Sequence, residues 1–204
     1  MAAPTGPPLV TIASEHGAFG DVAAPRVAEA LGVPFLDRAL PADPEQPEQR
    51  AGGIVGSLAR ASTMLGSAPL ERLDLDEGHA RAELAEFLAR ARRTGGVVLG
   101  RGGMVVLTDA PGALHVFLTG PPEGRIARIA RRDGVGRDEA ERRVEAHDRA
   151  RREYIRRTFG VEADDRALFH LIVDTIAVGV DATVELIVTA SRAHTARSDA
   201  TERS

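Results

Sequence analysis

The stretch from Leu9 to Asp21 constrains the fold of this chain more than any other part of its sequence. Residues 9–12 are apolar or β-branched, and a short turn containing Gly17 and Gly20 follows them directly. Behind this turn, apolar residues recur at helical spacing as far as Leu31, so the pattern predicts a strand, a tight loop and a helix. In such a unit the backbone N–H groups and the helix N-terminus can bind an anion.

The loop departs from the phosphate-binding pattern G-x-x-x-x-G-K-[ST] at each fixed position. Ser14 and Phe19 replace the two glycines, Gly20 replaces the lysine, and Asp21 replaces the serine or threonine. The chain contains no lysine at all, so arginines would have to neutralise a bound phosphate. Arginine grips phosphate oxygens bidentately rather than as a point charge. The sequence therefore predicts an anion site in this loop, but without the residues that usually bind phosphate.

Composition limits the class of protein. A chain of 204 residues fits one domain with an inserted flap. It has no cysteine, which excludes a disulfide framework and a thiolate metal site, and its net charge of −4 argues against general affinity for nucleic acid. No apolar run reaches the length of a membrane span, and the N-terminus lacks a leader pattern. We therefore expect a cytoplasmic protein that binds neither nucleic acid nor membrane.

Strand-like and helix-like patterns alternate along the rest of the chain. Strands are predicted at 33–38, 97–99, 114–118 and 169–175, and helices at 79–93, 104–107, from 122, at 138–157 and at 180–191. This alternation predicts an α/β fold with a parallel sheet and helices on both faces. We expect one domain over residues 9–191 with a flap at about 40–78, and disordered ends at 1–8 and 192–204.

In a parallel sheet, ligands bind beyond the carboxyl ends of the strands. Three predicted strands end in polar or glycine-rich turns, namely Ser14–Asp21, Asp37-Arg38 and Gly100-Arg101-Gly102, and we expect these turns to converge on one cleft. Arg101 is the strongest single candidate, because an arginine between two glycines suits a phosphate or carboxylate. The alternative interpretation of Arg101 is an ion pair beside a tight turn.

The stretch from Arg125 to Arg157 contains twelve arginines and seven acidic residues. One interpretation is a solvated helix pair joined by i,i+4 ion pairs, for example between Glu145 and Arg149. The other is a polar helical lid, over about 133–160, whose arginines neutralise phosphates during phosphoryl transfer. Asp148 and Arg151 fall on one face of this predicted lid.

Taken in order, these stretches resemble the cytidylate kinase-like family of nucleoside monophosphate kinases, from Val10 to about Ala190. Val10-Thr11-Ile12 with Glu15, Gly17 and Gly20 resembles the opening signature of that family, and 31–37 resembles its stretch ending in Pro-Phe-x-Asp. Leu99-Gly100-Arg101-Gly102 is similar to its Gly-Arg-Gly motif, and Asp148-x-x-Arg151 resembles its acceptor-binding pair. The resemblance implies a P-loop NTPase-like fold, with three α/β/α layers and a helical lid.

The resemblance implies ATP-dependent phosphoryl transfer to a nucleoside monophosphate of the CMP type or a similar small acceptor. ATP would contact Ser14, Glu15, His16, Gly17, Ala18, Phe19, Gly20, Asp21 and Arg132, with Mg²⁺ bridging its phosphates and Asp21 as a metal ligand. The acceptor would contact Asp37, Arg38, Gly100, Arg101, Gly102, Asp148 and Arg151. The catalytic arginines would be Arg101, Arg128, Arg149 and Arg151.

Two alternatives stay open. A catalytically degenerate relative would bind a nucleotide or phosphate ligand as a regulator or scaffold, and Phe19 and Asp21 decide between this role and catalysis. If the Phe19 ring fills the phosphate position, ATP cannot bind there; if the ring packs into the core and the loop still curves, catalysis is retained. An interaction module would instead use the acidic flap. An apolar helix face left over after core packing would indicate a homodimer.

Overall fold

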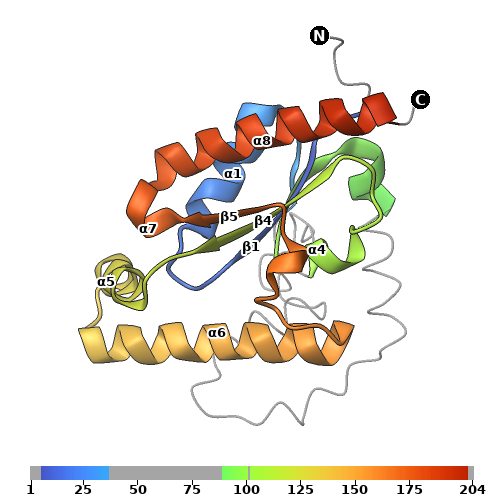
Figure 1. The fold of residues 1–204 in the computed structure, drawn as a ribbon. Helices are drawn as coiled ribbons and strands as arrows, with labels where there is room; N and C mark the ends of the chain where they lie inside the picture. The colour runs from blue at the N-terminus through green and yellow to red at the C-terminus, as the bar shows by residue number, and fades with distance from the viewer. Residues whose placement is uncertain (1–5, 37–88, 101, 202–204) are drawn as a thin grey trace, which may run out of the picture.

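The computed structural model describes residues 6–36, 89–100 and 102–201, and its centre is a five-stranded parallel sheet (Figure 1). The strand order is β2-β3-β1-β4-β5. The strands are β1 (Leu9–Ser14), β2 (Phe35–Leu36), β3 (Gly96–Leu99), β4 (Ala113–Thr119) and β5 (Leu171–Asp174). The predicted parallel α/β sheet is confirmed. The flap at 40–78 and the predicted site residues Asp37, Arg38 and Arg101 lie outside the described residues.

Helices cover both faces of the sheet (Figure 1). They are α1 (Gly20–Leu31), α4 (Gly103–Val106), α5 (Pro122–Asp133), α6 (Arg137–Phe159), α7 (Thr175–Val178) and α8 (Val180–Thr201), with a 3₁₀ turn at Arg166–Leu168. Residues 89–94 are also helical. Helices α1 and α8 pack on one face, whereas α4 and the C-terminal half of α6 pack on the other. No helix among the described residues is long and apolar enough to cross a membrane.

Side chains of β1 point to opposite faces of the sheet, so they belong to separate hydrophobic clusters. Val10 and Ile12 join the cluster beneath α1 and α8, whereas Ala13 faces α6 and α4 together with Phe117. All but the last residue of β1 are buried, as expected for a strand inside a parallel sheet that is covered on both faces. The central strand is therefore fixed from both sides, and it carries the loop that follows it.

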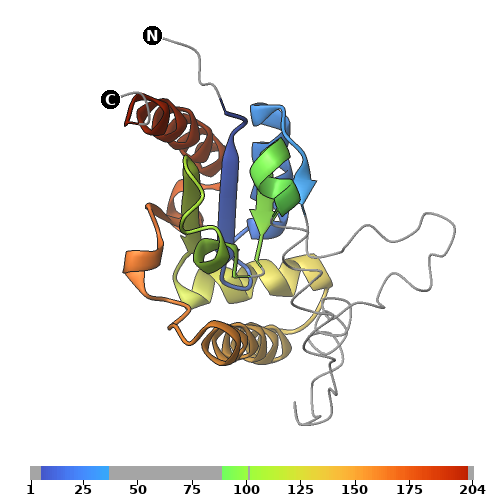
Figure 2. The same ribbon diagram turned by 90° about the vertical axis from the view of Figure 1, so that its right-hand side faces the viewer.

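The loop after β1 lies where the direction of chain winding reverses. Strand β1 pairs with β3 on one side and with β4 on the other. The connection from β1 leads toward the β2 edge of the sheet, whereas the connection from β3 crosses to β4 on the opposite side of β1. Ligands of open α/β sheets bind at this kind of position. In the turned view β1 runs down to its loop, and α6 lies beneath the loop (Figure 2).

The end of the chain differs from the prediction. Residues 192–201 continue α8, although the sequence pattern favoured a disordered tail from residue 192. Two hydroxyl side chains of this segment bond to the helix backbone: Thr195 donates to the carbonyl oxygen of Ser191, and Ser198 donates to that of His194. Such local bonds satisfy polar side chains inside a helix, so polarity here did not indicate disorder.

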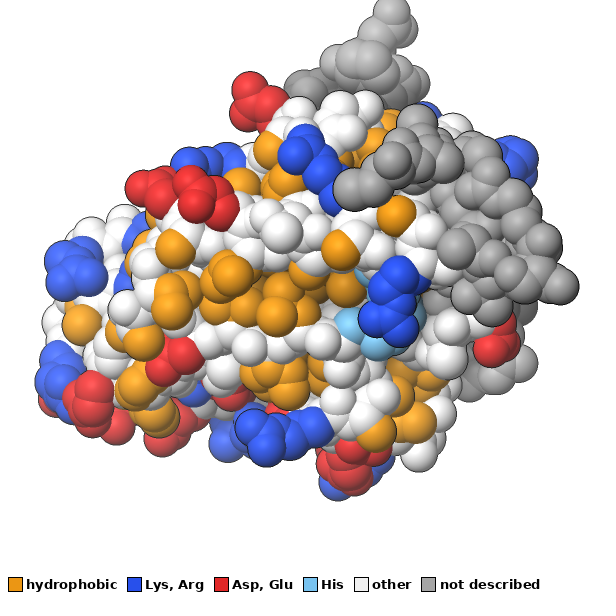
Figure 3. Space-filling view, turned by 45° about the horizontal axis from the view of Figure 1, so that its top comes forward, with side chains coloured by type: hydrophobic (Ala, Val, Ile, Leu, Met, Phe, Trp, Pro, Cys, Tyr) orange, Lys and Arg blue, Asp and Glu red, His pale blue; other side chains and the backbone are white. Residues whose placement is uncertain are grey.

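One face of the molecule exposes apolar side chains beside α8 (Figure 3). Among the described large hydrophobic residues, Ile172 on β5, Val178 on α7 and Leu186 on α8 are exposed. β5 is also an edge strand of the sheet. This leftover apolar surface is the feature that the sequence analysis named as an indicator of a homodimer, and the homodimer stays a prediction.

Three histidines form a column at the amino end of β5. His115 is buried on β4, and its Nδ1 lies 2.8 Å from the Thr11 hydroxyl. The His170 ring stacks on His115 at 4.9 Å between centroids, and His194 of α8 follows at 4.7 Å. Burial, together with the positive charge that His170 and His194 can carry, lowers the pKa of His115 to about 4.

We predict that His115 makes folding stability depend on pH. The unfolded chain binds a proton at this histidine below about pH 6.5, whereas the folded chain binds it only below about pH 4. The free energy of unfolding should therefore fall as the pH drops through this window, by about 2 kcal/mol. Urea unfolding of the wild-type protein and of His115→Gln at pH 7 and pH 4.5 measures this. A difference between the two proteins that is the same at both pH values would contradict the prediction.

Candidate functional site

Two glycines shape the loop between β1 and α1. Gly17 has a φ of 88°, and a Cβ atom there would lie 2.7 Å from the carbonyl oxygen of Arg125. A Cβ atom at Gly20 would lie 2.5 Å from the Cβ of Ser14. Only glycine fits such close approaches. The loop thus keeps a compact curve without the usual phosphate-binding sequence.

Phe19 takes a left-handed conformation, with φ 59°, at the N-cap of α1. Its carbonyl oxygen accepts hydrogen bonds from Val22 and Ala23, so the helix begins normally. The half-buried ring packs under the Arg128 guanidinium, whose central carbon lies 4.2 Å from the ring centroid. This contact is a cation–π interaction. The loop therefore still curves, and the ring supports an arginine from α5.

Asp21, in the first turn of α1, binds two arginines of α5. Its carboxylate oxygens accept from Nη2 of Arg128 at 2.8 and 3.0 Å and from Nη1 of Arg132 at 3.3 Å. Burial alone would raise the pKa of Asp21, but the hydrogen bond from Arg128 and the charges of both arginines outweigh it and lower that pKa. Arg128 is buried, and its Nη1 has no hydrogen-bond partner within the described part of the chain.

The predicted role of Asp21 as a magnesium ligand does not fit this arrangement. Both carboxylate oxygens are engaged by guanidinium groups, and two positive charges at hydrogen-bond distance would repel a divalent cation. The described residues also contain no group of three histidines or carboxylates that could hold a metal ion. A magnesium ion here would have to be held by the phosphate oxygens of a ligand and by water.

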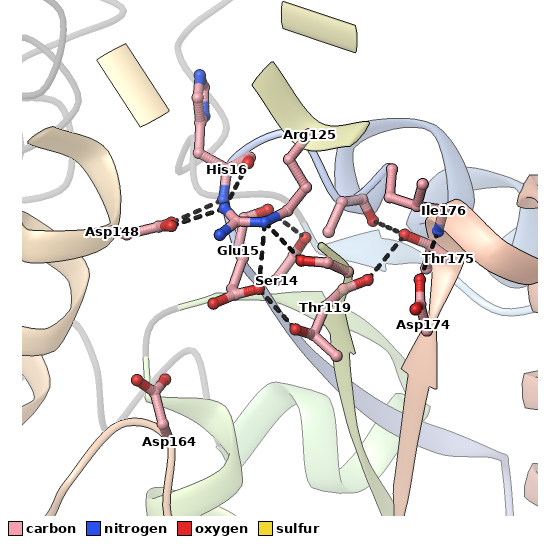
Figure 4. Close-up of polar contacts among 12 residues, drawn as sticks. Ser14, Glu15, His16, Thr119, Arg125, Asp148, Asp164, Asp174, Thr175 and Ile176 are labelled. Atoms are coloured by element: carbon pink, nitrogen blue, oxygen red, sulfur yellow. Dashed lines mark hydrogen bonds and ion pairs between the residues drawn. The ribbon is translucent and has the colours of Figure 1, made fainter. Parts of the chain in front are cut away.

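A buried arginine joins the loop to α5 and α6 (Figure 4). Nη1 of Arg125 on α5 donates to the carbonyl oxygen of His16 at 3.0 Å and to the Asp148 carboxylate of α6 at 2.7 Å. The other Asp148 oxygen accepts from the backbone N–H of His16 at 2.9 Å. Glu15 lies 3.3 Å from Nε of Arg125 and accepts from the Thr119 hydroxyl at 2.6 Å. We call these five residues the Arg125 network.

The opposite side of the loop is fixed by the end of β5. The Thr175 hydroxyl lies 3.1 Å from the carbonyl oxygen of Ala18 and 3.2 Å from that of Thr119 (Figure 4). Asp174 accepts from the N–H groups of Ile176 and Ala177, which caps α7 and holds Thr175 in place. Neither Thr119 nor Thr175 is among the site residues predicted from the sequence. The sequence feature that could have identified them is a polar residue at the carboxyl end of a predicted strand.

The predicted acceptor residues that the structure describes lie in different surroundings. Asp148 belongs to the Arg125 network and lies beside the loop instead of facing an open pocket. Arg151, one turn later on α6, lies 5.1 Å from the Phe117 ring centroid and pairs with Asp164. Gly102 has a φ of 68° and packs directly against the ring of Phe159 at the end of α6.

The structure brings together most of the predicted donor-site residues. Arg128 and Arg132 meet the loop at Phe19 and Asp21, and α6 reaches the loop at His16. Gly100 follows β3 and donates its N–H to Ile12, next to the loop. Arg149 is exposed on α6, and the roles of these side chains remain predictions.

Comparisons with known proteins agree with this architecture. The model of the cytidylate kinase-like family matches residues 9–177. A cytidylate kinase of Ignicoccus hospitalis is 28% identical over 183 residues, which span 88% of this chain and 96% of that protein.

Solved structures show the same fold. An uncharacterized protein from Eubacterium ventriosum has a TM-score of 0.67 at 18% identity, with 91% of this chain and 98% of that chain covered. A gluconokinase from Sinorhizobium meliloti has a TM-score of 0.51 at 20% identity, with 94% and 93% covered. At these identities the likeness concerns the fold alone, and it confirms the predicted P-loop NTPase-like architecture.

We predict that Gly17→Ala is far more destabilising than Gly134→Ala. Both glycines have positive φ, but a Cβ atom at Gly134 meets nothing within 4 Å, whereas one at Gly17 meets the backbone of Arg125. We expect Gly134→Ala to lower the free energy of unfolding by about 1 kcal/mol and Gly17→Ala by about 2–4 kcal/mol. Urea unfolding measures both values, and equal losses would show that the loop can move away from α5.

Proposed function

The chain belongs to the cytidylate kinase-like family, and from this premise we propose that it transfers the terminal phosphoryl group of ATP to a nucleoside monophosphate of the CMP type or a similar small acceptor. The cytidylate kinases among its relatives support phosphoryl transfer between nucleotides. The observation that carries the proposal is the pair of arginines, Arg128 and Arg132, held at the start of α1.

The ATP phosphates lie, in this proposal, over the loop and the N-terminus of α1. The N–H groups of Gly17, Phe19 and Gly20 donate to no backbone carbonyl oxygen within the described ranges, and the proposal assigns them to phosphate oxygens. The partial positive charge of the helix N-terminus favours an anion at the same place. Arg128 and Arg132 supply the positive charge that a lysine gives in the usual motif.

With Asp21 paired to the two arginines, the proposal assigns none of the described residues to magnesium. Magnesium bound with the nucleotide would supply neutralisation of charge on the transferred phosphate and on the leaving group. Because magnesium readily keeps several water ligands, few protein groups would be needed to hold it.

The acceptor lies beyond the carboxyl end of β3, beside Gly100 and Gly102. The proposal assigns it to Arg101, Asp37 and Arg38, which the structure does not describe, and to Arg151 from α6. Nη1 of Arg151 donates to the carbonyl oxygen of Ala163 and Nη2 pairs with Asp164, so an acceptor phosphate would have to compete with Asp164 for this arginine.

The residues of this chain contribute to transfer by position and charge. Phosphoryl transfer passes through a loose transition state that requires alignment of donor and acceptor more than covalent chemistry. The Arg125 network fixes the loop relative to α5 and α6, and Arg128 and Arg132 neutralise the phosphates at the loop. Arg149 is exposed on α6, and the proposal keeps it as a further arginine for the phosphates.

A second candidate function is favoured by the contact between Asp21 and the arginines. A carboxylate already neutralises the positive charge that a kinase needs for phosphate. A degenerate relative that binds a nucleotide or phosphate ligand without transferring phosphate would have this arrangement. Binding without turnover separates this candidate from the proposed kinase.

A coupled assay with Mg²⁺-ATP and a panel of nucleoside monophosphates tests the proposal. We expect Arg128→Gln to lower kcat/KM for ATP by at least about 10²-fold, because one charged donor to the phosphates is lost. The matched control is Arg131→Gln on the same helix, where the side chain is exposed, and it should stay within about twofold of wild type. Nucleotide binding without turnover would favour the degenerate relative. Failure to bind any nucleotide would contradict the kinase, and failure to bind inorganic phosphate as well would contradict both functions.

A further inference from the structure

We infer that the Asp21 carboxylate is a built-in competitor for the anion site at the start of α1, and that a phosphate group must displace it from Arg128 and Arg132. The inference deepens the proposed function, on which it rests for the identity of the incoming anion. It assigns to Asp21 control over phosphate affinity, in place of the metal-binding role expected from the sequence.

The two partners differ in their freedom to move. The Arg128 side chain is 9% exposed and is held over the Phe19 ring, whereas the Asp21 side chain is 48% exposed. A carboxylate that already faces water loses little when it rotates away from its partners, whereas a buried guanidinium cannot leave without losing its packing. An incoming anion therefore replaces Asp21, and Arg128 stays in place.

The site has donors that Asp21 does not use. Arg128 binds both oxygens of Asp21 through Nη2 alone, and its buried Nη1 lacks a partner among the described residues. A guanidinium normally grips an oxyanion through two nitrogens. Phosphate, with more oxygens than a carboxylate, can engage Nη1 together with the free N–H groups of the loop. The carboxylate is thus an incomplete occupant of a site that is suited to a larger anion.

The charges at the site determine how strongly Asp21 weakens phosphate binding. Asp21 pairs with both Arg128 and Arg132. Asp133 also pairs with Arg132, at 2.6 Å. Among the described residues, Arg128 is therefore the arginine whose charge Asp21 alone balances. After displacement, the Asp21 carboxylate remains in the first turn of α1 and repels the phosphate. Removal of this charge should therefore tighten phosphate binding by about tenfold or more.

Isothermal titration of inorganic tripolyphosphate and, separately, of ATP tests the inference. We expect Asp21→Asn to bind tripolyphosphate at least about tenfold more tightly than wild type. Asp138→Asn is the matched control, because it makes the same change in charge at an exposed residue in the first turn of α6. An equal gain in this control, or no gain in Asp21→Asn, would overturn the inference.

Two further variants exclude poor folding and effects unrelated to Arg128 as explanations of the result. Asp21→Ser keeps a small polar residue in the first turn of α1 and should reproduce the gain, even if Asp21→Asn folds poorly in thermal unfolding. In an Arg128→Gln background, Asp21→Asn should give a clearly smaller gain, because the competition for that arginine is gone and only the repulsion by Asp21 and its pairing with Arg132 remain. A gain of undiminished size in this background would contradict the geometry.

The two probes separate this inference from the proposed function. If Asp21→Asn tightens tripolyphosphate binding but no variant binds ATP, the competitor is real and the kinase proposal fails. If the protein uses ATP but Asp21→Asn leaves both affinities unchanged, the kinase proposal stands and the inference is wrong. A failure of every variant to bind tripolyphosphate also overturns the inference.

Discussion

The buried ion pair between Arg125 and Asp148 holds the loop after β1, α5 and α6 in one arrangement. Arg125 comes from α5 and Asp148 from α6, and the backbone of His16 lies between them as donor and acceptor. A buried charge that loses its partner costs about 3–5 kcal/mol, so the three segments cannot separate cheaply.

This anchor determines which arginines face the start of α1. Arg128 and Arg132 follow Arg125 by three and seven residues, so all three lie on the same face of α5. Once Arg125 is fixed beside the loop, the next turns of the helix carry Arg128 to Phe19 and Asp21, and Arg132 to Asp21. The positive charge of this region is therefore a consequence of helix geometry and one buried contact.

The residues that depart from the usual phosphate-binding pattern in this loop compensate for one another. Phe19 replaces a glycine at a left-handed position, which costs about 1–2 kcal/mol, and its ring offsets this cost by packing under Arg128. Asp21 replaces a hydroxyl residue and balances the charge that the arginines bring. Removing the lysine, adding an aromatic support and adding a carboxylate thus change the loop as a unit, while its curve, set by Gly17 and Gly20, is retained.

The sequence by itself determined the order of strands and helices, the parallel sheet and the family, because apolar periodicity and motif spacing are local patterns that each segment carries alone. It also placed the loop, Arg128 and Arg132 in one site. It could not determine the partners of the charged side chains: Asp21 meets Arg128 across 107 residues, and Asp148 meets Arg125 across 23. With twelve arginines and seven acids between Arg125 and Arg157, many pairings are compatible with the same pattern. Only the packing of α5 and α6 against the loop selects among them, because distance and burial decide which charges interact.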